Sequence, residues 1–103
     1  MSLQKKINKT SNVCTVTFQL PKEIADGAMD VKILGDFNNW DLEKAINMKP
    51  KNGVFQASVN LERDKEHQFR YLIDNEKWEN DPEADGYAPT PFGVDNSVVV
   101  ASK

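Results

Sequence analysis

The sequence predicts an all-β protein, an antiparallel β-sandwich, and three observations support that prediction. Apolar and polar residues alternate along residues 13–20, 55–61 and 67–73, as they do in strands with one buried face. Clusters of turn-forming residues separate these segments. The one candidate helix, at residues 41–45, is too short to be stable alone. Short strands joined by turns are typical of two packed antiparallel sheets.

The first third of the chain is expected to contain a tail and two strands. Residues 1–12 are polar and rich in lysine, so we expect a flexible N-terminal tail, followed by one domain over residues 13–101. A loop at residues 22–30 should connect the strand at residues 13–20 to a second strand at residues 31–34. The alternation in the first strand predicts four buried side chains, which are Cys14, Val16, Phe18 and Leu20.

The rest of the chain is expected to contain three more strands. An Asn-Gly pair at residues 52–53 is a hairpin signal before the strand at residues 55–61, and residues 67–73 form the next strand. Residues 80–91 include three prolines and are expected to be an irregular loop before a last strand at residues 96–101. Across the predicted strands, four large side chains are expected in the core: Phe18, Val59, Phe69 and Tyr71.

Composition and charge argue against several classes of partner. The chain of 103 residues fits one domain, and its net charge of −3 argues against nucleic acid, whose recognition needs clustered positive charge. No apolar stretch reaches the ~20 residues of a membrane span, and no signal peptide is visible. Cys14 is the single cysteine, so no intramolecular disulfide can form. We therefore expect a cytoplasmic protein without nucleic-acid or membrane partners.

The sequence Gly-Asp-Phe-Asn-Asn-Trp at residues 35–40 places two large aromatic residues inside a polar turn. A loop that only reverses the chain does not need such side chains. We expect Phe37 to point into the core and Trp40 to point outward. Asn38 is expected only to cap the turn, and the role of Asn39 is left open.

The motif at residues 35–40 resembles the signature of carbohydrate-binding module family 48, which occurs in isoamylases, glycogen branching enzymes and the β subunit of AMP-activated protein kinase. The similarity continues through residues 67–74, 78–82 and 92–96, and it covers about residues 13–100. The resemblance implies an early-set, immunoglobulin-like β-sandwich. It also implies a non-catalytic module that binds α-1,4-glucans such as glycogen, starch or maltooligosaccharides.

Carried over by position, the resemblance implies five carbohydrate-binding residues. Two are stacking aromatics, one is an arginine where the kinase-type domain has a lysine, one is a hydrogen-bonding asparagine, and one lies on a loop against the sugar. In that order they are Trp40, Trp78, Arg70, Asn96 and Phe92. Tryptophan can cover the apolar face of a glucose ring, while fixed polar groups meet its hydroxyls. The alternation also predicts that Arg70 points to solvent, since its neighbours Phe69 and Tyr71 face the core.

Two departures from the family pattern affect this predicted site. Val94 stands where the kinase-type domain has a threonine, so one polar contact is expected to be missing. The turn before Trp78 is one residue longer than usual and lacks the common glycine.

A structural explanation stays open for each predicted site residue. Trp40 and Trp78 could be core aromatics, because tryptophan is usually well buried. Arg70 could be a solvated strand residue paired with a carboxylate. Asn96 could only cap a turn, and Phe92 could be ordinary loop packing.

Catalytic and metal-binding chemistry finds little support in the sequence. Residues 81–86 resemble the start of a calcium loop, but position 92 is phenylalanine where that loop needs a carboxylate. His67 has no cysteine or histidine nearby and falls in the core-facing register, and no pair of carboxylates is marked for glycoside hydrolysis. We therefore expect no catalytic residue, no metal and no cofactor.

Three functions remain in order of preference. The first is the glucan-binding module. The second is a protein-interaction or regulatory β-sandwich domain that has lost sugar binding, and the third is an unrecognised small enzyme. The resemblance implies a glucan-processing enzyme or a kinase complex as protein partner.

Overall fold

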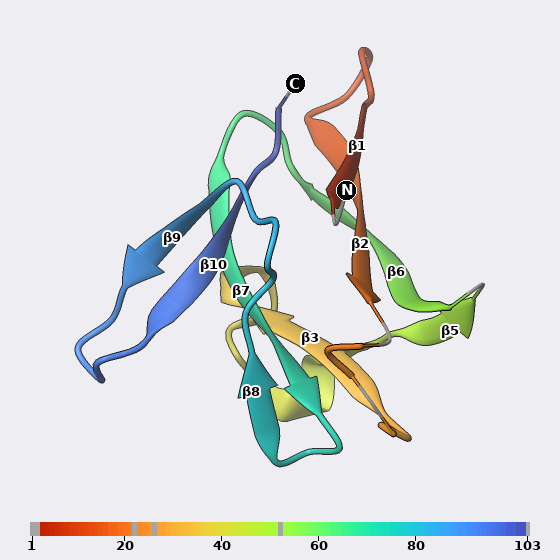
Figure 1. The fold of residues 1–103 in the computed structure, drawn as a ribbon. Helices are drawn as coiled ribbons and strands as arrows, with labels where there is room; N and C mark the ends of the chain where they lie inside the picture. The colour runs from red at the N-terminus through yellow and green to blue at the C-terminus, as the bar shows by residue number, and fades with distance from the viewer. Residues whose placement is uncertain (1–2, 22, 26, 52, 103) are drawn as a thin grey trace.

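The computed structural model describes residues 3–21, 23–25, 27–51 and 53–102, which form two antiparallel β-sheets packed face to face (Figure 1). One sheet has four strands in the order β1-β2-β6-β5, and the other follows the order β4-β3-β7-β10-β9 with β8 added to β7. The predicted immunoglobulin-like antiparallel β-sandwich is confirmed. Lys22, Asp26 and Asn52, which belong to predicted turns, lie outside the described residues.

The elements follow one another without any long helix between strands. In chain order they are β1 (Leu3–Ile7), β2 (Val13–Pro21), β3 (Val31–Gly35), the 3-10 helices η1 (Asp36–Asn38) and η2 (Leu42–Lys44), β4 (Ile46–Asn47), β5 (Lys49–Lys51), β6 (Val54–Glu62), β7 (Glu66–Ile73), β8 (Lys77–Glu79), β9 (Gly86–Pro89) and β10 (Asp95–Val100). The helical turn predicted at residues 41–45 corresponds to η2. Within the described part of the chain, no helix has the length and apolar character needed to cross a membrane.

The core forms where the inner faces of the two sheets meet. Every second side chain of β2 is buried, as the alternation predicted. Phe18 of β2 contacts Phe69 of β7 across the two sheets, edge to face, with ring centroids 4.9 Å apart. Such an aromatic pair contributes about 0.5–1.5 kcal/mol beyond its buried area. Tyr71 is also fully buried, and Val59 packs against this core as a partly buried side chain.

The N-terminal segment is not the loose tail that the sequence indicated. Residues 3–7 form β1, which pairs with β2 so that Leu3 lies opposite Phe18. Leu3 is buried, and Lys5 Nζ lies 2.6 Å from Asp85 Oδ2, which links β1 to the loop before β9. Because β1 is an edge strand, most of its side chains contact water and its sequence carries little apolar signal.

Two short edge strands were not predicted from the sequence. Strand β9 occupies four residues of the proline-rich segment, and Pro89 ends it at the edge of the sheet. Strand β5 contains Pro50 and is the edge of the other sheet. Proline removes a backbone donor but is tolerated on a strand edge that faces solvent. Because both segments contain residues typical of turns, the sequence pattern did not indicate either strand.

Strand β7 changes its hydrogen-bonding partner at Arg70. On one edge, β7 pairs with β3 from Phe69 to Ile73 without interruption. On the other edge, residues 66–69 pair with β10, whereas residues 71–73 pair with β8. Strands β8 and β10 therefore pair with β7 on either side of Arg70. Figure 1 shows β8 and β10 beside different parts of β7. The outer face of the six-stranded sheet is thus irregular at this residue.

A buried carboxylate anchors the segment between β8 and β10. Asp81 is fully buried, and its Oδ2 accepts a hydrogen bond of 2.7 Å from the Tyr71 hydroxyl. The backbone N–H of Asp81 donates to Ser97 Oγ at 2.9 Å, and the Tyr87 hydroxyl donates to the Asp81 carbonyl at 2.6 Å. Burial, and then the charge of Asp81, raise the pKa of Tyr71 well above its usual value. Asp81, the first residue of the segment that resembles the start of a calcium loop, is therefore a structural residue inside the sandwich.

Candidate functional site

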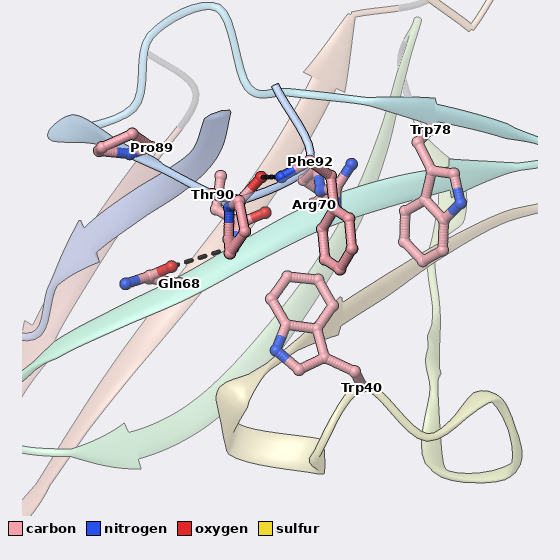
Figure 2. A pocket seen from close by; sticks show the side chains of 9 residues that line it. Trp40, Gln68, Arg70, Trp78, Pro89, Thr90 and Phe92 are labelled. Atoms are coloured by element: carbon pink, nitrogen blue, oxygen red, sulfur yellow. Dashed lines mark hydrogen bonds between the residues drawn. The ribbon is translucent and has the colours of Figure 1, made fainter. Parts of the chain in front are cut away.

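An open pocket of ≈ 490 Å³ lies on the outer face of the six-stranded sheet, where β7 changes partner (Figure 2). Its size falls within the range of about 300–1,000 Å³ that is usual for ligand pockets. Nine residues line it: Trp40, Gln68, Arg70, Trp78, Pro89, Thr90, Pro91, Phe92 and Asn96. All five residues named from the resemblance are among them.

The loop that carries Trp40 is held by the buried side chain of Asn38. Its Oδ1 accepts from the Gly35 N–H at 2.9 Å, and its Nδ2 donates to the Ile33 carbonyl at 3.2 Å. Asn39 and Trp40 both adopt φ of 56°, a left-handed conformation that costs non-glycine residues about 1–2 kcal/mol. The Trp40 N–H donates to the Gly35 carbonyl at 2.9 Å, which closes the turn and places the indole at the pocket.

Phe37 and Asp36 tie the same loop to the sandwich. The Phe37 ring packs on the core, with its centroid 6.2 Å from that of Phe18. Asp36 Oδ2 accepts from the Gln68 N–H at 2.9 Å, and Asp36 Oδ1 lies 3.4 Å from His67 Nδ1. The expected orientations, Phe37 inward and Trp40 outward, agree with these contacts. The loop is therefore fixed to β7, which supplies Arg70.

Trp78 follows the turn between β7 and β8, which contains no glycine. Asp74 and Asn75 adopt φ of 52° and 58°, and the Glu76 N–H donates to the Ile73 carbonyl at 3.1 Å. Asp and Asn tolerate this left-handed region better than other non-glycine residues. Strand β8 then pairs with β7 so that Trp78 lies opposite Leu72. The unusual turn therefore still delivers Trp78 to the outer face, where 43% of its surface is exposed.

The two indoles and the Arg70 guanidinium form one compact group (Figure 2). The Trp40 and Trp78 ring centroids are 6.4 Å apart and the ring planes differ by 61°. Arg70 Cζ lies 5.7 Å from the Trp40 centroid and 5.0 Å from the Trp78 centroid. At these distances cation–π attraction holds the arginine against both rings, with about 0.5–2 kcal/mol for each contact.

Asn96 is the polar end of the pocket. Only 8% of its surface is exposed, and its Nδ2 donates to Gln68 Oε1 at 2.9 Å. Among the described residues, three side-chain polar atoms are buried without a hydrogen-bond partner, and Asn96 Oδ1 and Arg70 Nε are two of them. An unpaired buried polar group costs about 1–3 kcal/mol, so this concentration favours a ligand-binding role for the pocket.

Phe92 lies on the tight loop between β9 and β10. Thr90 closes this loop, since its Oγ1 donates to the Val94 carbonyl at 2.6 Å and accepts from the Phe92 N–H at 3.3 Å. Gly93 allows the turn with φ of 79°. The phenylalanine side chain is 86% exposed and lines the pocket, which ordinary loop packing does not explain.

Sequence reasoning missed four of the nine lining residues. Gln68 lies two positions before Arg70 on the same strand, so the period-two pattern could have indicated its outward direction. The other three, Pro89, Thr90 and Pro91, gave no such signal because β9 was not recognised. Val94, at the position of the missing threonine, is outside the lining but offers its carbonyl to Thr90.

Two residues considered for other chemistry have structural positions. His67 is buried and its Nε2 lies 3.1 Å from the Glu62 carbonyl. Cys14 is fully buried in the core, and this burial raises the pKa of its thiol, which disfavours the reactive thiolate.

Comparisons with known proteins bear on the fold and the family of this chain. A structure of the enterobactin esterase from Shigella flexneri contains a region of the same fold, with a TM-score of 0.68 at 12% sequence identity. The match covers 96% of this chain and 32% of the esterase, so the chain spans about a third of that protein's length. No curated protein matches the sequence. Residues 22–102 match the family described as the glycogen recognition site of AMP-activated protein kinase, and the chain therefore belongs to this family, as its resemblance to carbohydrate-binding module family 48 predicted.

Proposed function

We propose that this protein binds α-1,4-linked glucan chains, such as glycogen, starch or maltooligosaccharides, through the pocket on β7. The observation that carries the proposal is the tilted pair of tryptophans, 6.4 Å apart with ring planes at 61°. Each indole offers an apolar face to one sugar ring at low cost in side-chain entropy. Phe92 adds a third exposed ring beside them.

The tilt of the indoles favours a curved chain over a flat one. Consecutive units of an α-1,4-glucan turn relative to one another, so their ring faces present different directions along the chain. Successive units of a β-1,4-glucan form a straight ribbon, whose faces would require nearly parallel platforms. Two rings inclined at 61° therefore fit neighbouring units of an α-linked chain better.

Polar groups at the edge of the indole pair supply the hydroxyl contacts. Arg70 offers donors, and Asn96 Oδ1 is an acceptor without a partner in the described structure. Because Asn96 Oδ1 is buried, a sugar hydroxyl pairs with it only if the Asn96 side chain turns toward the pocket, and that contact would remove the cost of the unpaired oxygen. The surface is open and shallow, so we expect weak binding of a short oligosaccharide, with Kd roughly between micromolar and millimolar.

A binding role rather than catalysis is supported by the pocket lining. Glycoside hydrolysis uses two carboxylic side chains on either side of the scissile bond. The described residues that line the pocket include no aspartate or glutamate. By family membership we also propose a glucan-processing enzyme or a kinase complex as protein partner. A cytoplasmic location fits the reduced, buried Cys14.

Calorimetric or NMR titration with maltoheptaose tests the proposal. Wild-type protein is expected to bind in the stated range, and Trp40→Ala or Trp78→Ala should each weaken binding about tenfold or more, since a stacked aromatic is worth about 1–3 kcal/mol. Leu42→Ala is the matched control, because Leu42 is an exposed apolar residue outside the pocket lining. Cellohexaose should bind more weakly than a maltooligosaccharide of the same length.

Two results would contradict glucan binding. One is a wild-type protein that shows no response at millimolar maltoheptaose. The other is normal binding by both tryptophan variants. Either result would leave the protein-interaction role as the better explanation of the fold.

A further inference from the structure

Arg70 is the positively charged residue of the pocket, and the described lining offers it no acidic partner. None of its side-chain nitrogens hydrogen-bonds to a described residue, and no described carboxylate lies within ion-pair distance of its guanidinium. Its side chain is nevertheless partly buried. A charge that is partly removed from water normally has a counter-charge, so this arginine calls for an explanation.

Other cations of comparable burial in the described part are paired. Lys5 Nζ lies 2.6 Å from Asp85 Oδ2, and Lys32 forms an ion pair with Asp30. The carboxylate of β8 beside Trp78 is also engaged, because Glu79 Oε1 lies 3.3 Å from Lys77 Nζ. Arg70 therefore keeps its charge available at the one place where a ligand would be stacked.

The two indoles hold the guanidinium in a fixed place without using its hydrogen bonds. Arg70 Cζ lies 5.7 and 5.0 Å from the two ring centroids, and Nε is buried between its neighbours. The terminal nitrogens are the donors that remain for a ligand. A guanidinium donates two parallel N–H groups, a geometry that matches the oxygens of a phosphate or carboxylate group.

An anion at this position would be attached to a sugar, because two indole rings lie close to the guanidinium, with centroids 5.7 and 5.0 Å from its Cζ. Glucans carry negative charge as phosphate monoesters on their hydroxyls. Such an ester would place three acceptor oxygens beside Arg70 while its own glucose ring, or the next one, stacks on an indole. A neutral hydroxyl would use only part of this donor capacity.

We propose that the pocket prefers a glucan that carries a phosphate monoester, with Arg70 as the residue that binds the phosphate. The proposal rests on the proposed glucan binding and adds the charge of the preferred ligand. It also explains why the arginine lacks a protein counter-ion in a chain whose net charge is −3.

Parallel titrations with maltoheptaose, maltoheptaose 6-phosphate and inorganic phosphate test this assignment. In wild-type protein at low salt, the phosphorylated sugar should bind about tenfold more tightly than the neutral one, by the strength of a charge-assisted hydrogen-bonded pair. Added salt should reduce this ratio, because part of the contact is exposed to solvent. Inorganic phosphate alone should bind more weakly than either sugar.

Variants of Arg70 separate charge from stacking. Arg70→Met should bring the ratio of the two sugar affinities close to one, and Arg70→Lys should keep part of it, because lysine retains the charge but not the paired donors. Lys49→Met is the matched control, since it removes a positive charge from the exposed edge strand β5 of the other sheet. The control should leave the ratio at its wild-type value.

The outcomes distinguish this inference from the proposed function. Equal wild-type affinity for the two sugars would overturn the inference and leave glucan binding intact, as would an Arg70→Met variant that kept the wild-type ratio. Inorganic phosphate that binds as tightly as the phosphorylated sugar would also overturn it, because the site would then take a free anion. Failure of wild-type protein to bind either sugar would end both proposals.

Discussion

The outer faces of the two sheets both carry polar side chains, but these side chains find hydrogen-bond partners in different ways. On the four-stranded sheet, side chains of β2 and β6 form cross-strand pairs. Thr15 Oγ1 donates to Asn60 Oδ1 at 2.7 Å, and the hydroxyls of Thr17 and Ser58 lie 2.8 Å apart. On the six-stranded sheet, Arg70 Nε and Asn96 Oδ1 are buried without partners. The first face pairs these polar side chains with one another, whereas the second buries two polar atoms that have no described partner.

The difference follows from strand pairing. Strands β2 and β6 stay in register over nine consecutive pairs, from Val13 with Glu62 to Pro21 with Val54. Each outward side chain therefore has a neighbour directly opposite, at a distance suited to a cross-strand pair. On one edge, strand β7 instead changes partner at Arg70, so on that side the Arg70 side chain meets the two indoles rather than a cross-strand neighbour. The pocket that we propose as the binding site lies where the regular ladder is interrupted.

The substitution Gly35→Ala should have the largest effect, because it breaks the support of the pocket face. A Cβ at this position would clash with the Gln68 carbonyl oxygen and lie 2.7 Å from Phe37 Cε2. We expect a loss of about 3 kcal/mol in the free energy of unfolding, at the upper end of overpacking effects. Urea unfolding measures this change.

The control for this substitution is Gly86→Ala. A Cβ there would have Val98 Cβ at 3.9 Å as its nearest contact, so we expect a change of less than about 1 kcal/mol. Equal stability of wild-type protein and Gly35→Ala would show that the loop carrying Trp40 is not fixed to β7 as described.

The substitution Tyr71→Phe should have the next largest effect on stability. It tests a buried polar contact inside the sandwich, separately from the two outer faces. Removal of the hydroxyl leaves Asp81 Oδ2 without its 2.7 Å hydrogen bond, which should cost about 2 kcal/mol of stability. Both outer faces should keep their contacts.

The same variant has a distinct pH dependence. The pKa of Tyr71 is raised by burial and by Asp81 above the value of 10.0 that applies to the unfolded chain. The contribution of this group to stability is therefore complete below pH 10 and is lost as the pH rises further. Wild-type stability should fall more steeply above pH 10 than that of Tyr71→Phe. Parallel curves in alkaline urea titrations would contradict this.

The substitution Thr17→Val should have the smallest effect on stability. It tests whether the outer face of the four-stranded sheet has only a structural role. It removes one cross-strand hydrogen bond but keeps a β-branched side chain in the strand. We expect a change in stability within about 0.5 kcal/mol and no change in maltoheptaose affinity. A clear loss of sugar affinity would place a second binding surface on the four-stranded sheet.

The sequence was informative where the signal is local. Alternation identified β2, β6 and β7, and it oriented Arg70 outward because a strand repeats every two residues. The aromatic members of the site, such as Trp40 and Phe92, were named from the resemblance rather than from the pattern. Their convergence on one pocket is a finding of the structure, and their role as sugar contacts stays a prediction.

The rest depends on contacts between distant parts of the chain. The hydrogen bond between Gln68 and Asn96 joins residues that are 28 positions apart in the sequence, and the ion pair between Lys5 and Asp85 joins residues that are 80 positions apart. No local pattern indicates such contacts. Strand β1 was missed for the same reason, since its stability comes from β2 and the Asp85 loop rather than from its own apolar residues.

Both tryptophans of the sequence, Trp40 and Trp78, belong to the pocket. All indole fluorescence of the protein therefore originates there, beside a guanidinium group, and reports on this surface without a label. Because the two rings are 6.4 Å apart and inclined at 61°, their electronic transitions couple and should produce a paired circular-dichroism signal. The sign and size of that signal depend on the distance and angle between the two rings. A ligand that changes this geometry should therefore change the circular-dichroism signal.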